Sequence, residues 1–179
     1  MDSHRVDDMP DDANDRSLPG GMALRLARLL NLVLAGVLTG NEVGTKAVVH
    51  PALDTLPRGA RYEAERAVVG RYGRVMPVLM PLTILSAVPL LVAIRDRRSP
   101  AFRATLTGVV AYGAMVAVTV GGELPINRRI LDPAAPAAPD DFEERRRRWD
   151  RNHTARVACD LIGFACFCVG ALAGSEGAA

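Results

Sequence analysis

The segment from residues 149 to 160, WDRNHTARVACD, carries the side chains that are best suited to chemistry. In a helix, residues three, four, seven and eleven positions apart share one face. That face would present an indole, an amide, an imidazole, a guanidinium and a carboxylate, from Trp149, Asn152, His153, Arg156 and Asp160. An imidazole can accept a proton near neutral pH, and amide and guanidinium groups can donate hydrogen bonds to an anion. The face is therefore a candidate for acid–base chemistry.

An apolar run, residues 161–172, follows this face directly. Polar groups beside or within hydrocarbon cost several kcal/mol unless they have partners. Hydrophobic residues make up 49% of the chain but aromatic residues only 4%, and the hydrophobic residues are gathered into runs. This distribution predicts membrane-spanning helices rather than a soluble core.

Four apolar runs are long enough to cross a hydrocarbon core of about 30 Å. We expect membrane spans at residues 22–49, 72–94, 104–122 and 153–172. The predicted fold is all-α, an integral membrane four-helix up-down bundle.

The bundle is expected to occupy residues 22–173, between a disordered polar tail at residues 1–21 and a short tail at residues 174–179. The segment 51–67 is polar, and we expect a surface loop with one short interfacial helix there. The Ala- and Pro-rich segment 128–141 is expected to be an extended linker.

Connectivity alone places the ends of spans one and three beside the beginnings of spans two and four. The polar residues gather at these four ends, which predicts a polar pocket in one half of the bundle. Besides the face described first, they are Glu42, Lys46, His50, Arg71, Arg74, Glu123 and Asn127. Glu42 and Lys46 are four residues apart and could simply pair with each other. Ionisable residues inside a span are, however, candidates for function.

The charge pattern gives no sign of nucleic-acid binding, because the net charge is only +2 and the chain shows no basic face. Almost all basic residues are arginine, and Lys46 is the single lysine. The expected environment of the protein is the lipid bilayer. We expect a bacterial cell membrane. Gly36, Gly40 and Gly44 form a stripe of small residues that allows close helix approach, within the bundle or between the subunits of a homodimer.

Four segments carry a resemblance to a known family. They are GNEVGTKAVVHPAL at residues 40–53, RYGRVMPVLMP at 71–81, ELPINRRILDP at 123–133 and WDRNHTAR at 149–156. In this order and at these helix ends, they resemble the anthrone oxygenase-like family of four-helix membrane proteins. The resemblance extends from about residue 24 to residue 172.

This resemblance implies an enzyme, a monooxygenase that oxidises an anthrone to an anthraquinone with molecular oxygen, as in polyketide natural-product biosynthesis. The substrate would be a hydrophobic aromatic molecule that enters from the lipid. Such a reaction needs a base that removes a C–H proton, donors for the resulting enolate oxygen, and a dry, flat slot.

For that reaction, His153 is the expected base, and Asn152, Asn127 and Arg156 are expected donors to the oxyanion. Glu42 or Asp160 would orient His153 or neutralise Arg156. The remaining candidates are expected to bind substrate, and they are Trp149, Arg74, Glu123 and Asp160. An electron-rich enolate can react with oxygen directly, so no cofactor is expected.

Two alternatives remain open. His50 and His153 could join Glu42 or Glu123 in a two-histidine, one-carboxylate site for iron or copper. The polar cluster could instead be structural, or bind a lipid or small molecule without catalysis.

Overall fold

The structure is a computed structural model that describes residues 18–134 and 139–176. Within these residues it is entirely helical, which confirms the predicted fold class. Four helical stretches are long and apolar enough to cross a membrane, and they are Gly21–Asp54, Arg58–Ala93, Pro100–Ile130 and Phe142–Gly174. Most of the predicted polar tail, and the last three residues of the chain, lie outside the described residues.

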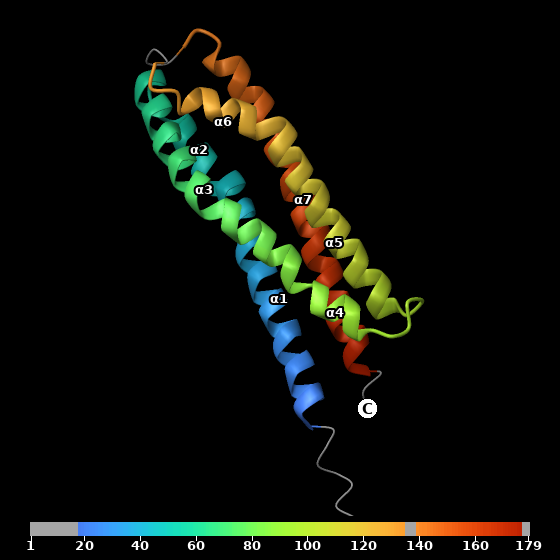
Figure 1. The fold of residues 1–179 in the computed structure, drawn as a ribbon. Coiled ribbons are helices and arrows are strands. Elements are labelled where there is room, and N and C mark those ends of the chain that lie inside the picture. Colours follow the sequence, from blue (N-terminus) through green and yellow to red (C-terminus); the bar gives the residue numbers. More distant parts are fainter. Residues whose placement is uncertain (1–17, 135–138, 177–179) are drawn as a thin grey trace, which may run out of the picture.

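Each of the first three stretches is built from more than one helical element (Figure 1). The first contains α1 (Leu18–Gly44), the π-helical η1 (Thr45–Val49) and α2 (His50–Asp54). The second contains α3 (Arg58–Ser86) and α4 (Val88–Ala93), and the third contains α5 (Pro100–Val118), the π-helical η2 (Thr119–Glu123) and α6 (Leu124–Ile130). The fourth is the single long helix α7 (Phe142–Glu176).

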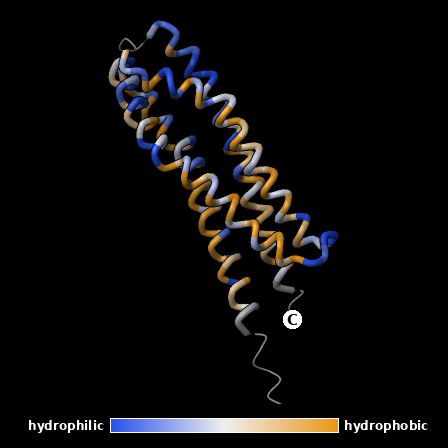
Figure 2. The backbone as a smooth tube through the Cα atoms, viewed as in Figure 1, coloured by the Kyte–Doolittle hydropathy of each residue, from blue (hydrophilic) through white to orange (hydrophobic). Residues whose placement is uncertain are grey.

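The outer surface of the bundle suits a bilayer. Figure 2 shows hydrophobic residues along the middle of all four stretches and hydrophilic residues at the end formed by α2, α6 and the start of α7, and at the turn before α5. Large apolar side chains are exposed on every stretch, for example Leu30, Val78, Val110 and Leu161. Exposed apolar area of this extent indicates contact with lipid.

The helices are longer than the predicted spans. The segment 51–67 was expected to be mainly a loop, but only residues 55–57 lie outside helix there. The reason is composition, because residues 58–71 are rich in Ala, Glu and Arg, which favour helix. The third stretch also continues past its predicted end at residue 122, because Pro125 lies in the first turn of α6, where a missing N–H costs little. The expected extended linker at residues 128–141 is correspondingly shorter.

Helices α5 and α7 approach each other closely through glycines. A β-carbon on Gly108 would lie 2.6 Å from the Phe167 ring, and one on Gly163 would lie 2.7 Å from the Tyr112 ring. The Tyr112 and Phe167 rings stack on each other, with centroids 5.4 Å apart. The Tyr112 hydroxyl also donates to the backbone oxygen of Ala35, 3.2 Å away. This core ties α1, α5 and α7 together below the polar end.

Filling this close contact should destabilise the bundle. We expect Gly163→Leu to lower the free energy of unfolding by about 1–3 kcal/mol, because the new side chain must displace Tyr112. Gly113→Leu is the matched control, since a β-carbon there would meet no atom within 4 Å. The midpoint of unfolding in detergent measures both variants, and equal midpoints would contradict this account of how α5 and α7 pack.

Candidate functional site

Two π-helical turns position the acidic residues of the site. Glu42 lies at the end of α1, just before η1, and Glu123 is the last residue of η2. π-helical segments are rare, and they occur frequently at functional sites. Gly122 precedes Glu123, and a β-carbon there would lie 2.6 Å from the side chain of Asn152. The glycine therefore lets η2 approach α7 closely enough for Glu123 to reach its partners.

Helix α7 supplies the basic side of the site from the face predicted by the 3.6-residue period. Trp149, His153, Arg156 and Asp160 are all buried, and Asn152 is half-buried beside them. Residues between them, such as Arg151 and Thr154, are exposed. The sequence therefore identified the inward face of this helix correctly.

Arg156 joins two carboxylates that come from different helices. Its Nη2 donates to Oε1 of Glu42 at 2.5 Å, and its Nη1 donates to Oε2 of Glu123. The exposed fractions of Glu42 and Glu123 are only 3% and 1%. Buried charges need partners of this kind, because an unpaired charge in a low-dielectric interior is very costly.

His153 completes this arrangement. Its Nδ1 lies 3.3 Å from Oε2 of Glu42 and 3.8 Å from Oε1 of Glu123. Each carboxylate thus directs one oxygen to Arg156 and the other toward His153. We refer to Glu42, Glu123, His153 and Arg156 as the acid–base cluster. Among the described residues, neither ring nitrogen of His153 has a hydrogen-bond partner.

The acid–base cluster borders a cavity of about 330 Å³, which we call the central cavity. All four stretches contribute to its wall. Helix α3 supplies an apolar side, and its lining residues are Val69, Tyr72, Gly73, Met76, Pro77, Met80 and Pro81. The volume lies at the lower end of the range for small-molecule sites, about 300–1,000 Å³. An apolar wall opposite a few convergent polar groups is typical of such sites.

Polar contacts close the end of the central cavity that lies nearest α2 and α6. Trp149 stacks on His153, with ring centroids 4.7 Å apart, and its Nε1 donates to Oδ1 of Asn127 at 3.1 Å. The hydroxyl groups of Thr45 and Tyr72 are 2.6 Å apart and join η1 to α3. These contacts hold Asn127 and Tyr72 at the cavity wall.

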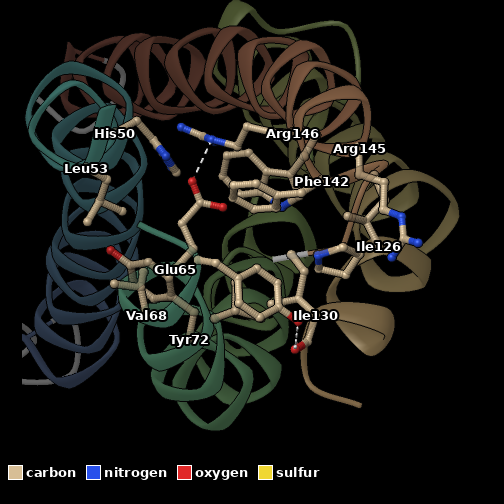
Figure 3. A pocket seen from close by; sticks show the side chains of 14 residues that line it. His50, Leu53, Glu65, Val68, Tyr72, Ile126, Ile130, Phe142, Arg145 and Arg146 are labelled. Carbon is tan, nitrogen blue, oxygen red and sulfur yellow. Dashed lines mark hydrogen bonds and ion pairs between the residues drawn. The ribbon is translucent and has the colours of Figure 1, made fainter. Parts of the chain in front are cut away.

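A second, much smaller cavity of about 40 Å³ lies beyond Trp149 (Figure 3). Its charged side is a buried pair, in which Nε of Arg146 lies 2.8 Å from Oε1 of Glu65. Arg61 also contacts Glu65, at 3.3 Å, and reaches Asp54 at 3.0 Å. These ion pairs join α2, α3 and α7 at the polar end, which gives them a structural role.

Besides His50, three predicted site residues lie away from the central cavity. Arg74 is exposed and donates to the backbone oxygen of Gly70 in its own helix. Asn152 packs over Gly122 instead of lining the cavity. Asp160 is fully buried one helical turn beyond Arg156, and its carboxylate forms no hydrogen bond with any described residue. Glu42, not Asp160, therefore contacts both His153 and Arg156.

The pair between Glu42 and Lys46, one of the two readings that the sequence left open, does not form. Lys46 contacts Asp150 of α7 at 2.6 Å, while Glu42 points to Arg156. The π-helical turn that begins at Thr45 changes the angular relation between the residues on either side of it. The four-residue spacing therefore does not pair their side chains here.

The geometry does not fit the iron or copper alternative. His50 lies near His153, with ring centroids 5.4 Å apart, but both of these rings also contact Trp149. In the described parts of the chain, no group of three His, Cys, Asp or Glu side chains could hold a metal ion. One oxygen of each of the two carboxylates is engaged by Arg156.

Sequence reasoning missed Tyr72, which lines the central cavity beside Thr45. It chose Arg74 from the same RYGR segment. Residues two apart in a helix point in nearly opposite directions, so only one of the two can face inward. The side-chain types could have decided between Tyr72 and Arg74, because a tyrosine is buried in an apolar wall far more readily than an arginine.

The fold and the site define a four-helix membrane protein with a buried acid–base cluster beside an apolar cavity. Residues 66–166 match the anthrone oxygenase family. This match covers more than half of the 179 residues, so the chain belongs to that family. The match starts within α3, and Glu42 therefore lies outside it. No curated protein and no solved structure matches the chain.

Replacing Arg156 should show how strongly two buried carboxylates destabilise the protein when their cation is missing. We expect Arg156→Gln to lower the free energy of unfolding by about 3–5 kcal/mol, because it leaves buried acidic groups without a cation. Adding Glu42→Gln and Glu123→Gln should restore part of that loss. Arg151→Gln, at an exposed position of α7, is the control. Thermal unfolding in detergent measures all variants, and an Arg156→Gln protein as stable as the control would contradict the ion-pair arrangement.

Proposed function

We propose that this protein oxidises an anthrone-like aromatic compound to the corresponding quinone with molecular oxygen. The observation that carries the proposal is His153, which lies between two carboxylates at the wall of an apolar cavity. Membership of the anthrone oxygenase family supports the reaction class. An imidazole at the wall of an apolar cavity supports the proposal, because the reaction requires a base and an apolar slot.

His153 acts as the base in this proposal. The oxygens of Glu42 and Glu123 attract the imidazole proton to Nδ1, which leaves the lone pair of Nε2 free to accept a proton. The two carboxyl groups outnumber the one guanidinium, so a positive charge on His153 is balanced within the acid–base cluster. When His153 takes up a proton, the new positive charge therefore has a negative partner in the low-dielectric interior.

The reaction starts at the methylene group opposite the anthrone ketone. His153 Nε2 takes one methylene proton, and the electron pair moves to the ketone oxygen to give an aromatic enolate. The amide of Asn127, oriented by its hydrogen bond to Trp149, and the hydroxyl of Tyr72 are the proposed donors to that oxygen.

Oxygen is then reduced at the same carbon. The enolate carbon bonds to O2, and His153 returns its proton to give a hydroperoxide. Loss of the second C–H proton and cleavage of the O–O bond release one water and leave a ketone. The balance is one anthrone and one O2 to one quinone and one water.

We expect His153→Gln to reduce turnover at least 100-fold, because general-base catalysis contributes roughly 10²–10⁴-fold. The assay follows O2 uptake and quinone absorbance with 1,8-dihydroxyanthrone and the purified protein in lipid vesicles. Asp150→Asn, which removes the neighbouring ion pair with Lys46 outside the central cavity, should remain active. Unchanged turnover in His153→Gln would rule out this residue as the base.

Metal removal separates the proposed reaction from the iron or copper alternative. We expect protein treated with strong chelators, and shown by elemental analysis to lack iron and copper, to keep its turnover. Loss of activity on chelation that returns with added iron or copper would instead establish a metal-dependent oxidase.

The non-catalytic alternative makes a different prediction in the same assay. A binding protein would retain the anthrone at about one molecule per chain without O2 uptake above that of empty vesicles. Binding without oxygen consumption would therefore overturn the proposed reaction and leave a small-molecule carrier.

A further inference from the structure

The central cavity is closed along two of its seams by hydrogen bonds. The hydroxyl pair of Thr45 and Tyr72 closes the seam between η1 and α3. The bond from Trp149 to Asn127 closes the seam between α7 and α6. The His50 ring covers Trp149 from the polar side, with centroids 4.6 Å apart. These contacts lie between the central cavity and the polar end of the bundle.

The seam between α3 and η2 is different. Among the described residues, no hydrogen bond or ion pair joins residues 73–81 of α3 to η2. Helix α3 instead contacts the two elements on either side of η2, which are α6 and α5. On the polar side, the hydroxyl of Tyr62 donates to the backbone oxygen of Ile130, and on the other side Met80 belongs to the buried core with Met115. Figure 1 shows α3 running obliquely from α2 at one end toward α5 at the other, so that it diverges from α6.

The residues on both edges of this seam line the cavity and also lie on the outer surface. Gly73, Pro77 and Pro81 of α3 are exposed, and Val120 of η2 has an exposed fraction of 58%. All four are apolar or without a side chain, and all lie within stretches that can cross a membrane. The outer side of this seam is therefore a hydrocarbon-facing surface.

We propose that the central cavity opens sideways into the bilayer between α3 and η2, and takes a flat hydroxylated aromatic molecule from the lipid phase. The occupant must be apolar to partition into lipid and to lie against α3. It must also carry polar oxygen groups, because the amide of Asn127 and the hydroxyl of Tyr72 line the same cavity. The choice of occupant rests on the proposed function, whereas the lateral opening rests on the geometry of the seam alone.

Trp149 provides a native probe of the cavity, because it lines the cavity and is the only tryptophan of the chain. The experiment uses the full-length protein in phosphatidylcholine vesicles, with 1,8-dihydroxyanthraquinone as the probe. We expect the probe to quench Trp149 fluorescence from the lipid phase, and iodide in the aqueous phase to leave it unquenched.

Narrowing the seam should slow this quenching. The variant Gly73→Phe with Val120→Phe is expected to lower the quenching rate by about tenfold or more. A β-carbon at Gly73 meets no atom within 4 Å, so the new side chain has room in the opening. Val110→Phe is the matched control, because Val110 is equally exposed on α5 but does not line the cavity. The control should quench at the wild-type rate.

The outcomes separate the two proposals. Quenching at the wild-type rate in the double variant, or efficient quenching by iodide, overturns lateral access while leaving the proposed reaction intact. Seam-dependent quenching without any quinone formation from the anthrone supports lateral access and overturns the reaction. Failure of the probe to quench wild-type Trp149 at any concentration overturns lateral access, whereas the turnover assay alone decides the reaction.

Discussion

The bridge from Arg156 to Glu42 and Glu123 is the interaction on which the polar half of the bundle depends. It joins α1, η2 and α7 in the buried interior, where any of these charged side chains would be very costly without a partner. The same three groups fix the position of His153, because the carboxylate oxygens not used by Arg156 lie next to its Nδ1. A single guanidinium thus joins three helical elements and the two carboxylates that contact the His153 imidazole.

The cavity beside this bridge has two unlike walls. The α3 wall has few polar groups and carries two prolines, whereas the wall from α1, η2 and α7 carries every charged residue that faces the space. A substrate held between them would meet hydrocarbon on one side and a proton acceptor on the other. Such an arrangement, an apolar wall opposite a few polar groups, is typical of small-molecule sites.

Much of this arrangement could be predicted from the sequence, because hydropathy and connectivity act over many residues. Four apolar stretches bring their polar ends together whatever their detailed structure, and the 3.6-residue period placed His153 and Arg156 on one inward face. The partners of individual side chains could not be predicted in the same way. The π-helical turn after Glu42 shifts the angular position of Lys46. Tyr72, and not Arg74, faces inward, and residue spacing does not show which of the two is buried.

The long sequence separation of the bridge has a consequence for how the protein is made. Glu42 and Arg156 are 114 positions apart, so the ribosome delivers the first span to the bilayer well before the arginine has been synthesised. The first span must therefore enter the membrane before the cation that binds Glu42 in the folded protein has been made, at a real insertion cost. Insertion of the fourth span then becomes the step that commits the polypeptide to its final topology, and a nascent chain that stalls earlier is a natural target for membrane quality control.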